Sequence, residues 1–525
     1  MKILVSDPLS REGIEILTEK FQVDEKVNLA EDELTAIIGD YDALVVRSGT
    51  RVTAPVIDAG KNLKVIGRAG VGVDNIDVTR ATEKGVIVLN APEGNTVSAA
   101  EHAVAMMMAL SRNIPGASNS LKNREWKRSQ FMGVELYNKT LGVVGLGRVG
   151  SEVIRRAKAM GMRVQGYDPY ISVERADKLG VKLVSLEEIY RTSDFITLHL
   201  PKTGATYHMI GEKEIAMMKE GVRIVNCARG GLIEEKAFLK ALQSKKIAGA
   251  ALDVFEKEPA ADNPLVGLDN VVATPHLGAS TREAQVNVAI QVAHQVVAAL
   301  MGEPVVTAVN VPAIPPETLA DVKPFIPLMN TLGKFYMQVF NGQVESIELS
   351  YCGEIAAYPV APLTTSCLIG LLSVMLHGES VNYVNAPHIA KQRGIKIKEI
   401  TTSHCENFTN LVSLKVKTNQ GTKVIGGTVF NKNDVRIVQI DQYRIDVVPS
   451  PYMLVCTHFD QPGVIGRVGS ALGQAGVNIA GMQVGRITVG GEAVMILQVD
   501  HVVGEGLLKH LSTLESILSA NFVQL

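Results

Sequence analysis

Three ionisable side chains near the middle of the chain each follow a short apolar run. Arg229 stands in "NCARGGLI", Glu258 in "DVFEKEP" and His276 in "TPHLGAST". Histidine carries protons near neutral pH, a carboxylate beside it raises its pKa, and a guanidinium binds carboxylates and polarised oxygen atoms. Such a set suits hydride transfer at a 2-oxo or 2-hydroxy acid, where a proton carrier and a cation must stand at the reacting oxygen.

Each of these residues also has an ordinary alternative. A lone loop histidine is usually a surface residue, Arg229 could brace its own loop, and Glu256 competes with Glu258 for the acidic role. Ligands of an open parallel sheet bind beyond the carboxyl ends of its strands. If the three residues end strands of one sheet, they meet in one cleft, and we predict His276 as the proton carrier.

The loop "GLGRVG" predicts a binding site for the second reactant of a hydride transfer, a dinucleotide. Gly145, Gly147 and Gly150 have G-x-G-x-x-G spacing between an apolar run and a helical pattern, and Asp168 ends the next apolar run. In this motif the glycines permit a tight turn, a close approach to a pyrophosphate and helix packing on the sheet. The carboxylate of Asp168 would bind ribose hydroxyls and repel a 2′-phosphate, so the loop predicts NAD rather than NADP.

The surrounding elements predict an α/β protein. Short apolar runs alternate with helical patterns over roughly the first 310 residues, which favours two lobes built on parallel sheets. After "TPHLG", Ser280 and Glu283 have capping-box spacing, and the helix that follows should end at Gly302. The proline-dense "VPAIPPETLADVKPFIP" predicts a linker, an α+β region follows it, and the last segment has the ferredoxin-like order βαββαβ.

Bulk composition excludes several classes of protein. The 525 residues are too many for one core, and a net charge of -2 favours neither nucleic acid nor a membrane surface as a partner. The five cysteines are scattered without a Cys-x-x-Cys pair, so we expect no metal site and no disulfide framework. The start lacks signal-peptide features and no apolar run reaches the roughly 18 residues of a membrane span, so we expect a cytoplasmic protein.

At "GLGRVG", "NCARGGLI", "DVFEKEP" and "TPHLGAST" the sequence resembles the D-isomer-specific 2-hydroxyacid dehydrogenase family. The resemblance implies a flavodoxin-like substrate-binding lobe (1–95 plus 282–310) and an inserted Rossmann NAD-binding domain (96–281). It also implies the active-site roles of Arg229, Glu258 and His276. Beyond the glycine loop, it implies NAD contacts at Val71, Arg148, Val149, Asp168, Leu200, Cys227, Ala228, Arg229, Asp253, His276, Leu277, Gly278 and Ala279. Several members carry threonine where Val71 and Leu200 stand, so only backbone contacts are expected at those two positions.

Within the family, "VVRSGT", "GRAGVGVDNID" and "EWKRSQFMG" are most similar to long-form members that oxidise 3-phosphoglycerate to 3-phosphohydroxypyruvate for serine synthesis. In these, backbone amides around Gly70, Val71 and Gly72 would hold the substrate carboxylate. The residues themselves favour a phosphorylated substrate, because Arg47 and Arg68 end apolar runs at the expected cleft and a dianion suits an arginine cluster. Arg128, in "NREWKRS", could join this cluster or belong to a solvated basic face.

The stretch "HFDQPGVIGRVGSALGQAGVNIAGMQVGR" resembles the ACT domain, a sensor of small ligands. The resemblance implies an intervening α+β domain (315–447) that can bind an anion, an ACT regulatory domain (450–525), L-serine as feedback effector, and a homodimer or homotetramer. Asp460 and Asn478 flank the predicted ACT helix and suit the ammonium and carboxylate of an amino acid, although Asp460 could equally be a helix cap.

Two alternatives remain open on the sequence. One is another D-2-hydroxyacid dehydrogenase, such as a glyoxylate or hydroxypyruvate reductase, which Arg47 and Arg68 argue against. The other is a non-enzymatic NAD-sensing binding protein on the same scaffold, similar to the C-terminal-binding-protein corepressors, which lack an ACT domain.

Overall fold

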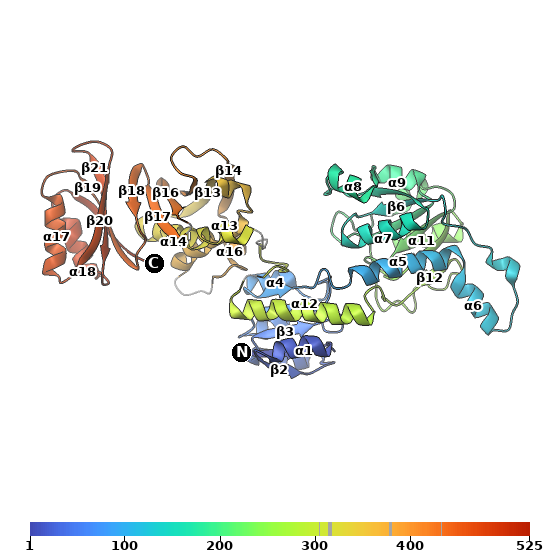
Figure 1. Cartoon of the computed structure of the whole chain (residues 1–525). Helices are drawn as coiled ribbons and strands as arrows, with labels where there is room; N and C mark the ends of the chain where they lie inside the picture. The colour runs from blue at the N-terminus through green and yellow to red at the C-terminus, as the bar shows by residue number, and fades with distance from the viewer. Residues whose placement is uncertain (304, 313–317, 377–380, 432) are drawn as a thin grey trace.

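The computed structural model describes residues 1–303, 305–312, 318–376, 381–431 and 433–525. The boundary predicted at residue 315 and the middle of the predicted linker lie outside these ranges. The end of that linker was predicted wrongly, because it is helical in α13 (Leu319–Val322) and in the first turn of α14 (Phe325–Val339). In the described residues, two parallel sheets of five and seven strands are followed by a six-stranded mixed sheet and a four-stranded antiparallel sheet. The predicted fold class is therefore confirmed. Figure 1 shows the seven-stranded unit at one end of the molecule and the four-stranded unit at the other.

The first lobe is a parallel sheet completed by a helix from much later in the chain. Its strand order is β2 (Gln22–Glu25), β1 (Lys2–Val5), β3 (Ala43–Val46), β4 (Val65–Arg68), β5 (Ile87–Leu89). Helix α12 (Arg282–Met301) packs on β4 and on α1 (Arg11–Thr18). A Cβ at Gly67 would lie 2.6 Å from Val296 and 2.9 Å from Val292, so this glycine allows α12 to lie close against β4.

Two details of α12 differ from the sequence analysis. Its N-cap is Thr281, whose hydroxyl accepts from the Ala284 amide, and not Ser280. Both residues are good cap formers, and the extended backbone of Thr281 decides between them. In the described residues α12 is also long and apolar enough to cross a membrane by length and composition, which was not expected. Most of its buried residues belong to the core of the first lobe: Val288, Val292, Ala293, Val296 and Leu300.

The second lobe is a doubly wound parallel sheet. Its order is β12 (Val271–Ala273), β11 (Ile247–Leu252), β10 (Val222–Asn226), β9 (Phe195–Leu198), β6 (Thr140–Val144), β7 (Arg163–Tyr167), β8 (Lys182–Leu183). Helices α5 (Thr96–Ser111) and α7 (Arg148–Ala159) cover one face, and α9 (Leu186–Thr192), α10 (Glu212–Met217) and α11 (Glu235–Gln243) cover the other. The strand order reverses between β9 and β6, which places a ligand crevice at the carboxyl ends of these strands.

The third unit is a mixed sheet packed against two apolar helices. Its order is β14 (Lys396–Thr402), β13 (Val344–Gly353), β15 (Asn410–Thr418), β16 (Gly421–Phe430), β17 (Asp434–Ile440), β18 (Tyr443–Val447). Helices α14 (Phe325–Val339) and α15 (Ala361–Met375) supply much of its core. The unit meets the first lobe where the amide of Asn382 donates to the Gly85 carbonyl oxygen at 2.9 Å.

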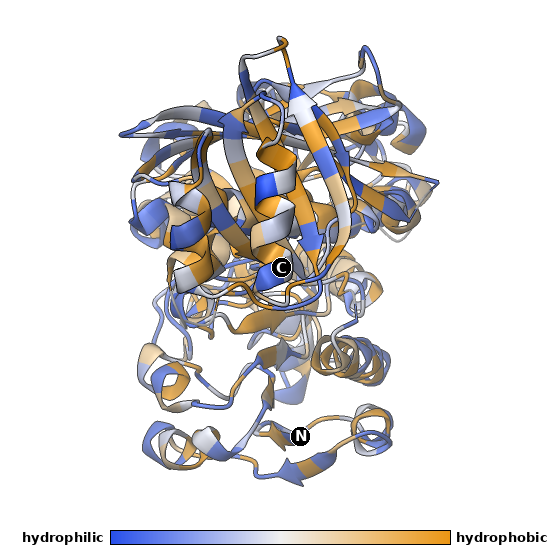
Figure 2. Cartoon of the chain, turned by 90° about the vertical axis from the view of Figure 1, so that its left-hand side faces the viewer, coloured by the Kyte–Doolittle hydropathy of each residue, from blue (hydrophilic) through white to orange (hydrophobic). Residues whose placement is uncertain are grey.

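The last unit has the predicted order βαββαβ: β19 (Tyr452–Phe459), α17 (Val464–Gln474), β20 (Ile479–Arg486), β21 (Glu492–Val499), α18 (Glu505–Thr513), β22 (Ile517–Gln524). Helices α17 and α18 cover the outer face of the sheet (Figure 2). The inner face shares a core with the third unit through Met453, Val455, Val494, Ile496 and Val523. The two units therefore depend on each other for burial of their apolar surface.

Candidate active site

A cavity of about 680 Å³ lies between the two lobes, at the ends of their strands. Its walls include Arg47, Arg68 and Gly70 from the first lobe, and Glu258 and His276 from the second. Arg47 directly follows β3, Arg68 ends β4, and the loops after β11 and β12 carry Glu258 and His276. Side chains of both lobes therefore meet in one cavity beyond the carboxyl ends of the parallel strands, which is where ligands of such sheets bind.

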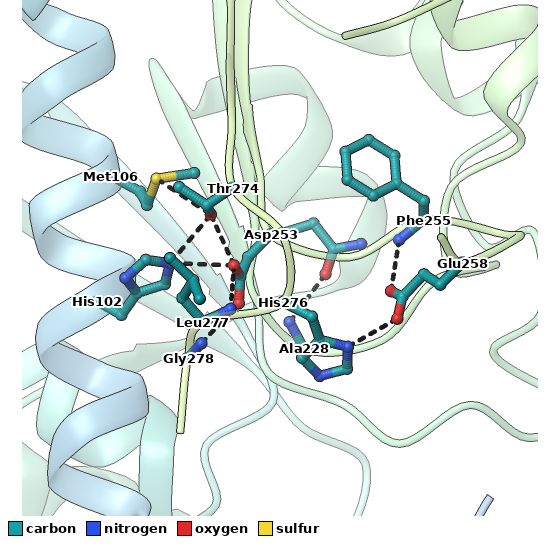
Figure 3. Close-up of polar contacts among 11 residues, drawn as sticks. His102, Met106, Ala228, Asp253, Phe255, Glu258, Thr274, His276, Leu277 and Gly278 are labelled. Atoms are coloured by element: carbon teal, nitrogen blue, oxygen red, sulfur yellow. Dashed lines mark hydrogen bonds and ion pairs between the residues drawn. The ribbon is translucent and has the colours of Figure 1, made fainter. Parts of the chain in front are cut away.

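His276 and Glu258 are in direct contact (Figure 3). The Nδ1 atom of His276 lies 2.8 Å from Oε2 of Glu258, whose Oε1 accepts from the Phe255 amide at 3.1 Å. The hydrogen bond to Glu258 raises the pKa of His276 above its ordinary value, against the opposing effect of burial. Burial would raise the pKa of Glu258, but its hydrogen bond and charge pairing with His276 lower it overall. The pair thus combines a carboxylate with a histidine of increased proton affinity.

The competing carboxylate, Glu256, is engaged elsewhere. Its Oε1 lies 2.9 Å from Nε2 of His208 and accepts from the Glu235 amide at 3.1 Å. Its partners are therefore the neighbouring loop and α11, and the geometry distinguishes it from Glu258.

Arg229 follows β10 and approaches the first lobe. Its guanidinium donates to the Ala228 carbonyl oxygen at 2.7 Å, and its Nε atom lies 3.2 Å from Oδ2 of Asp74. A Cβ at Gly72 would lie 2.2 Å from the guanidinium, so the side chain is adjacent to the loop that contains Gly70, Val71 and Gly72. Sequence reasoning missed Asp74, because the ion pair joins segments that are distant in the chain.

Arg68 stands at the wall of the cavity with Arg47, and among the described residues no carboxylate accepts a hydrogen bond from its guanidinium. Burial, followed by the charges of Arg229 and Arg47, lowers the pKa of Arg68 to about 10. The Nε atom of Arg68 is buried and has no hydrogen-bond partner among the described residues. This is an environment suited to an anion. Arg128 does not line this cavity, because it lies in the exposed segment between α6 (Ile114–Lys122) and β6, which projects from the second lobe.

The glycine loop fits a dinucleotide in its local geometry. Gly145 has φ +95°, and a Cβ there would lie 2.4 Å from the His199 carbonyl oxygen. A Cβ at Gly150 would lie 2.0 Å from the Gly145 carbonyl oxygen, whereas nothing lies within 4 Å of one at Gly147. The turn and the helix contact therefore require glycine, and the space beside Gly147 at the start of α7 is open, as an approaching pyrophosphate needs.

The other predicted cofactor residues lie around the same crevice. Asp168 follows β7 and accepts from the amides of Leu146 and Tyr170, both at 2.9 Å. Val149 lies in the first turn of α7, Leu200 follows β9, and Cys227 and Ala228 follow β10. The guanidinium of Arg148 pairs with Glu93, 3.1 Å away, at the crossing between the lobes.

Asp253 organises the loop that carries His276 (Figure 3). Its buried carboxylate accepts from the Thr274 hydroxyl at 2.6 Å and from the amides of Leu277 and Gly278 at 2.7 and 2.8 Å. Ala279, at the end of this loop, lines the cavity. Sequence reasoning missed a further partner, His102 of α5. The sequence signal for it is a histidine within a largely apolar helix.

The predicted effector residues lie apart within one chain. Asp460 precedes α17 and pairs with Arg486 at 2.7 Å, whereas Asn478 follows the helix and donates to Asp500 at 2.8 Å. An intact helix separates them, so a single copy does not bring both to one ligand. His458, which sequence reasoning did not single out, is buried beside Asp460, and its Nε2 atom lacks a hydrogen-bond partner in the described residues.

Three family models match consecutive parts of the chain. The D-isomer specific 2-hydroxyacid dehydrogenase NAD binding domain matches residues 104–278, the D-3-phosphoglycerate dehydrogenase intervening domain 321–441 and the ACT domain 452–516. Among solved structures, a glyoxylate reductase from Paecilomyes thermophila is 33% identical with a TM-score of 0.55, covering 59% of this chain and 98% of that one. A D-lactate dehydrogenase from Aquifex aeolicus, complexed with NAD and lactic acid, is 29% identical with a TM-score of 0.51, covering 58% of this chain and 96% of that one.

Full-length relatives share all four units. The D-3-phosphoglycerate dehydrogenase of Methanocaldococcus jannaschii is 49% identical over 527 residues, covering 100% of both chains. That of Synechocystis is 47% identical over 525 residues, covering 100% of this chain and 95% of the relative. The chain therefore belongs to the D-3-phosphoglycerate dehydrogenases, in the long form with intervening and ACT domains, within the D-isomer specific 2-hydroxyacid dehydrogenase family.

Proposed function

We propose that the protein oxidises 3-phosphoglycerate to 3-phosphohydroxypyruvate with NAD, the first step of L-serine biosynthesis. The observation that carries this proposal is the hydrogen-bonded pair of His276 and Glu258 in a cavity whose other wall holds Arg47 and Arg68. The relatives that share the whole domain order are named for this activity.

The hydrogen-bonding pattern supports a specific proton-transfer role for His276. A carboxylate only accepts, so Nδ1, which faces Glu258, carries a hydrogen and Nε2 is the basic nitrogen. In the oxidative direction Nε2 removes the proton from the substrate hydroxyl, and Glu258 stabilises the imidazolium that forms. Bound NAD supplies the hydride acceptor.

The remaining site residues bind and orient the substrate. The guanidinium of Arg229 would hold the carboxylate and the reacting oxygen, together with the amides around Gly70 and Gly72. Arg47 and Arg68 would take the phosphate, because its two charges compensate arginines whose positive charge the neighbouring Asp74 and Asp7 offset only in part. Asp168 and the glycine loop would hold the cofactor.

The test is NADH formation from 3-phosphoglycerate, with a trap for the product. We expect turnover in the wild type. In the His276→Ala variant, turnover should fall by about 10²-fold or more while NAD still binds. Near-normal turnover in this variant would contradict the role of His276.

The same assay separates the two alternatives. A glyoxylate or hydroxypyruvate reductase would consume NADH with those substrates and fail with 3-phosphoglycerate. A non-enzymatic NAD-sensing protein would bind NAD without turnover of any of them.

We also propose the domain division 1–95 plus 282–310, 96–281, 315–447 and 450–525, with L-serine acting on paired ACT domains. A homodimer or homotetramer is supported by the exposed apolar side chains of the projecting segment, where Trp126 is 82% and Met132 85% exposed. A reducing compartment such as the cytoplasm suits five free cysteines.

A further inference from the structure

His102 lies on α5, the helix that begins where the chain enters the second lobe, and its side chain approaches the loop that carries His276. Its Nε2 atom lies 3.2 Å from both Oδ1 of Asp253 and Oγ1 of Thr274 (Figure 3). Its side chain is only 19% exposed, and that of Asp253 is 1% exposed. The contact is therefore a buried link between α5 and the segment that carries His276.

The hydrogen on Nε2 follows from the neighbouring atoms. Burial would raise the pKa of Asp253, but the hydrogen bonds from His102, Thr274 and the Leu277 amide together lower it, so this group is a carboxylate and only accepts. The hydroxyl hydrogen of Thr274 points to Oδ1 of Asp253 at 2.6 Å. Both neighbours of Nε2 thus present lone pairs, and Nε2 must donate.

Asp253 in turn determines the conformation of His276. The carbonyl oxygen of Asp253 accepts from the His276 amide at 3.0 Å, and its carboxylate holds the next two amides. His276 has φ +56°, a left-handed conformation that a residue other than glycine adopts only when its surroundings enforce it. The charge of Asp253 also raises the pKa of His276, after the larger effects of Glu258 and burial.

We propose that His102 is a positioning residue for the proposed oxidation. It acts through Asp253 and Thr274 to keep the ring of His276 in hydrogen-bonding contact with Glu258. The inference rests on the proposed function. Loss of the Nε2 donor leaves a buried carboxylate with fewer partners, so the loop and the bond between His276 and Glu258 both loosen.

The consequence for pH dependence has a definite sign. Oxidation needs neutral His276, so kcat/KM rises with pH through the raised pKa of His276. Weaker contact with Glu258, or partial protonation of Asp253, moves that pKa back toward its ordinary value. The charged groups facing His276 are otherwise unchanged; they are Glu258, Asp253 and Arg229, with Arg47 and Arg68 at the same cavity.

The experiment compares the full-length wild type with His102→Leu, which removes the donor, and His102→Gln, whose amide can still donate. His294→Leu, at an exposed histidine of α12, is the control. With 3-phosphoglycerate and NAD, we expect His102→Leu to lose about tenfold or more in kcat, since displacement of a reacting group by ~1 Å can cost ~10²-fold. The acid limb of its pH profile of kcat/KM should move to lower pH, while the profiles of His102→Gln and of the control should stay near that of the wild type.

A readout independent of turnover keeps this inference separate from the proposed function. The pH dependence of His276 modification by diethyl pyrocarbonate, followed by peptide mass spectrometry, should shift to lower pH in His102→Leu. Wild-type turnover that fails with 3-phosphoglycerate would overturn the proposed substrate alone. An unshifted modification profile in a folded His102→Leu protein, or an equal shift in His102→Gln, would overturn the role of the Nε2 donor.

Discussion

At the scale of single residues, one hydrogen bond sets the pH dependence of the proposed reaction. The carboxylate of Glu258 raises the pKa of His276 by hydrogen bonding and charge. In Glu258→Gln the charge is lost, so the pKa of His276 should fall. Because oxidation needs neutral His276, the acid limb of kcat/KM should move to lower pH. Glu256→Gln is the matched control, because that carboxylate contacts His208. A limb that stays in place in Glu258→Gln would show that another group controls the titration.

The buried arginine at the cavity wall should decide between phosphorylated and unphosphorylated substrates. Among the described residues, the buried Nε atom of Arg68 has no hydrogen-bond partner, and the charges of Asp74 and Asp7 offset burial and the charges of Arg229 and Arg47 only in part. Charge-assisted hydrogen bonds contribute roughly 1.5–3 kcal/mol. The change Arg68→Gln should therefore lower kcat/KM for 3-phosphohydroxypyruvate reduction by about 10- to 100-fold. Hydroxypyruvate reduction, measured in parallel, should change far less; an equal loss on both substrates would assign Arg68 to the carboxylate or to the fold.

At the scale of elements, alanine substitutions at two glycines of one loop should have different effects, one on stability and the other on NAD binding. Alanine at Gly150 would place its Cβ 2.0 Å from the Gly145 carbonyl oxygen, so Gly150→Ala should lower the melting temperature. Alanine at Gly147 meets no atom within 4 Å, so Gly147→Ala should keep the melting temperature and weaken NAD binding. Thermal unfolding and NAD titration of both variants separate these effects. Unchanged NAD affinity in Gly147→Ala would place the cofactor elsewhere.

Elements were predictable where the signal is local. The alternation of strands and helices, the glycine loop and the end of α12 at Gly302 depend on periodicity or on one backbone conformation, and all appear in the structure. The cap of α12 was wrong by one residue, because Ser280 and Thr281 have similar propensities. Asp74 and His102 escaped notice because their partners, Arg229 and Asp253, are far away in the chain. Tertiary packing creates these pairs, and no local sequence pattern predicts them.

At the scale of the whole molecule, the proposed inhibition by L-serine would have to act over a distance. The ACT unit lies at one end of an elongated chain, and the third unit lies between it and the first lobe (Figure 1). The cavity is lined by residues of the first two lobes. Deleting the ACT unit would expose the core that Met453 and Val455 share with its neighbour. Loss of serine inhibition after such a deletion would therefore mix regulation with stability, and a point variant is the sharper test.

Asn478 provides that variant. It lies on the surface after α17, and among the described residues its side chain hydrogen-bonds only to Asp500, so its replacement should leave the fold and the turnover intact. If L-serine binds between paired ACT domains, Asn478→Ala should raise the serine concentration needed for half-inhibition by at least about tenfold, the effect of losing roughly 1.4 kcal/mol. Gln474→Ala, which removes an exposed amide from the last turn of the same helix, should not. Equal serine sensitivity in Asn478→Ala and the wild type would move the effector site away from this end of α17.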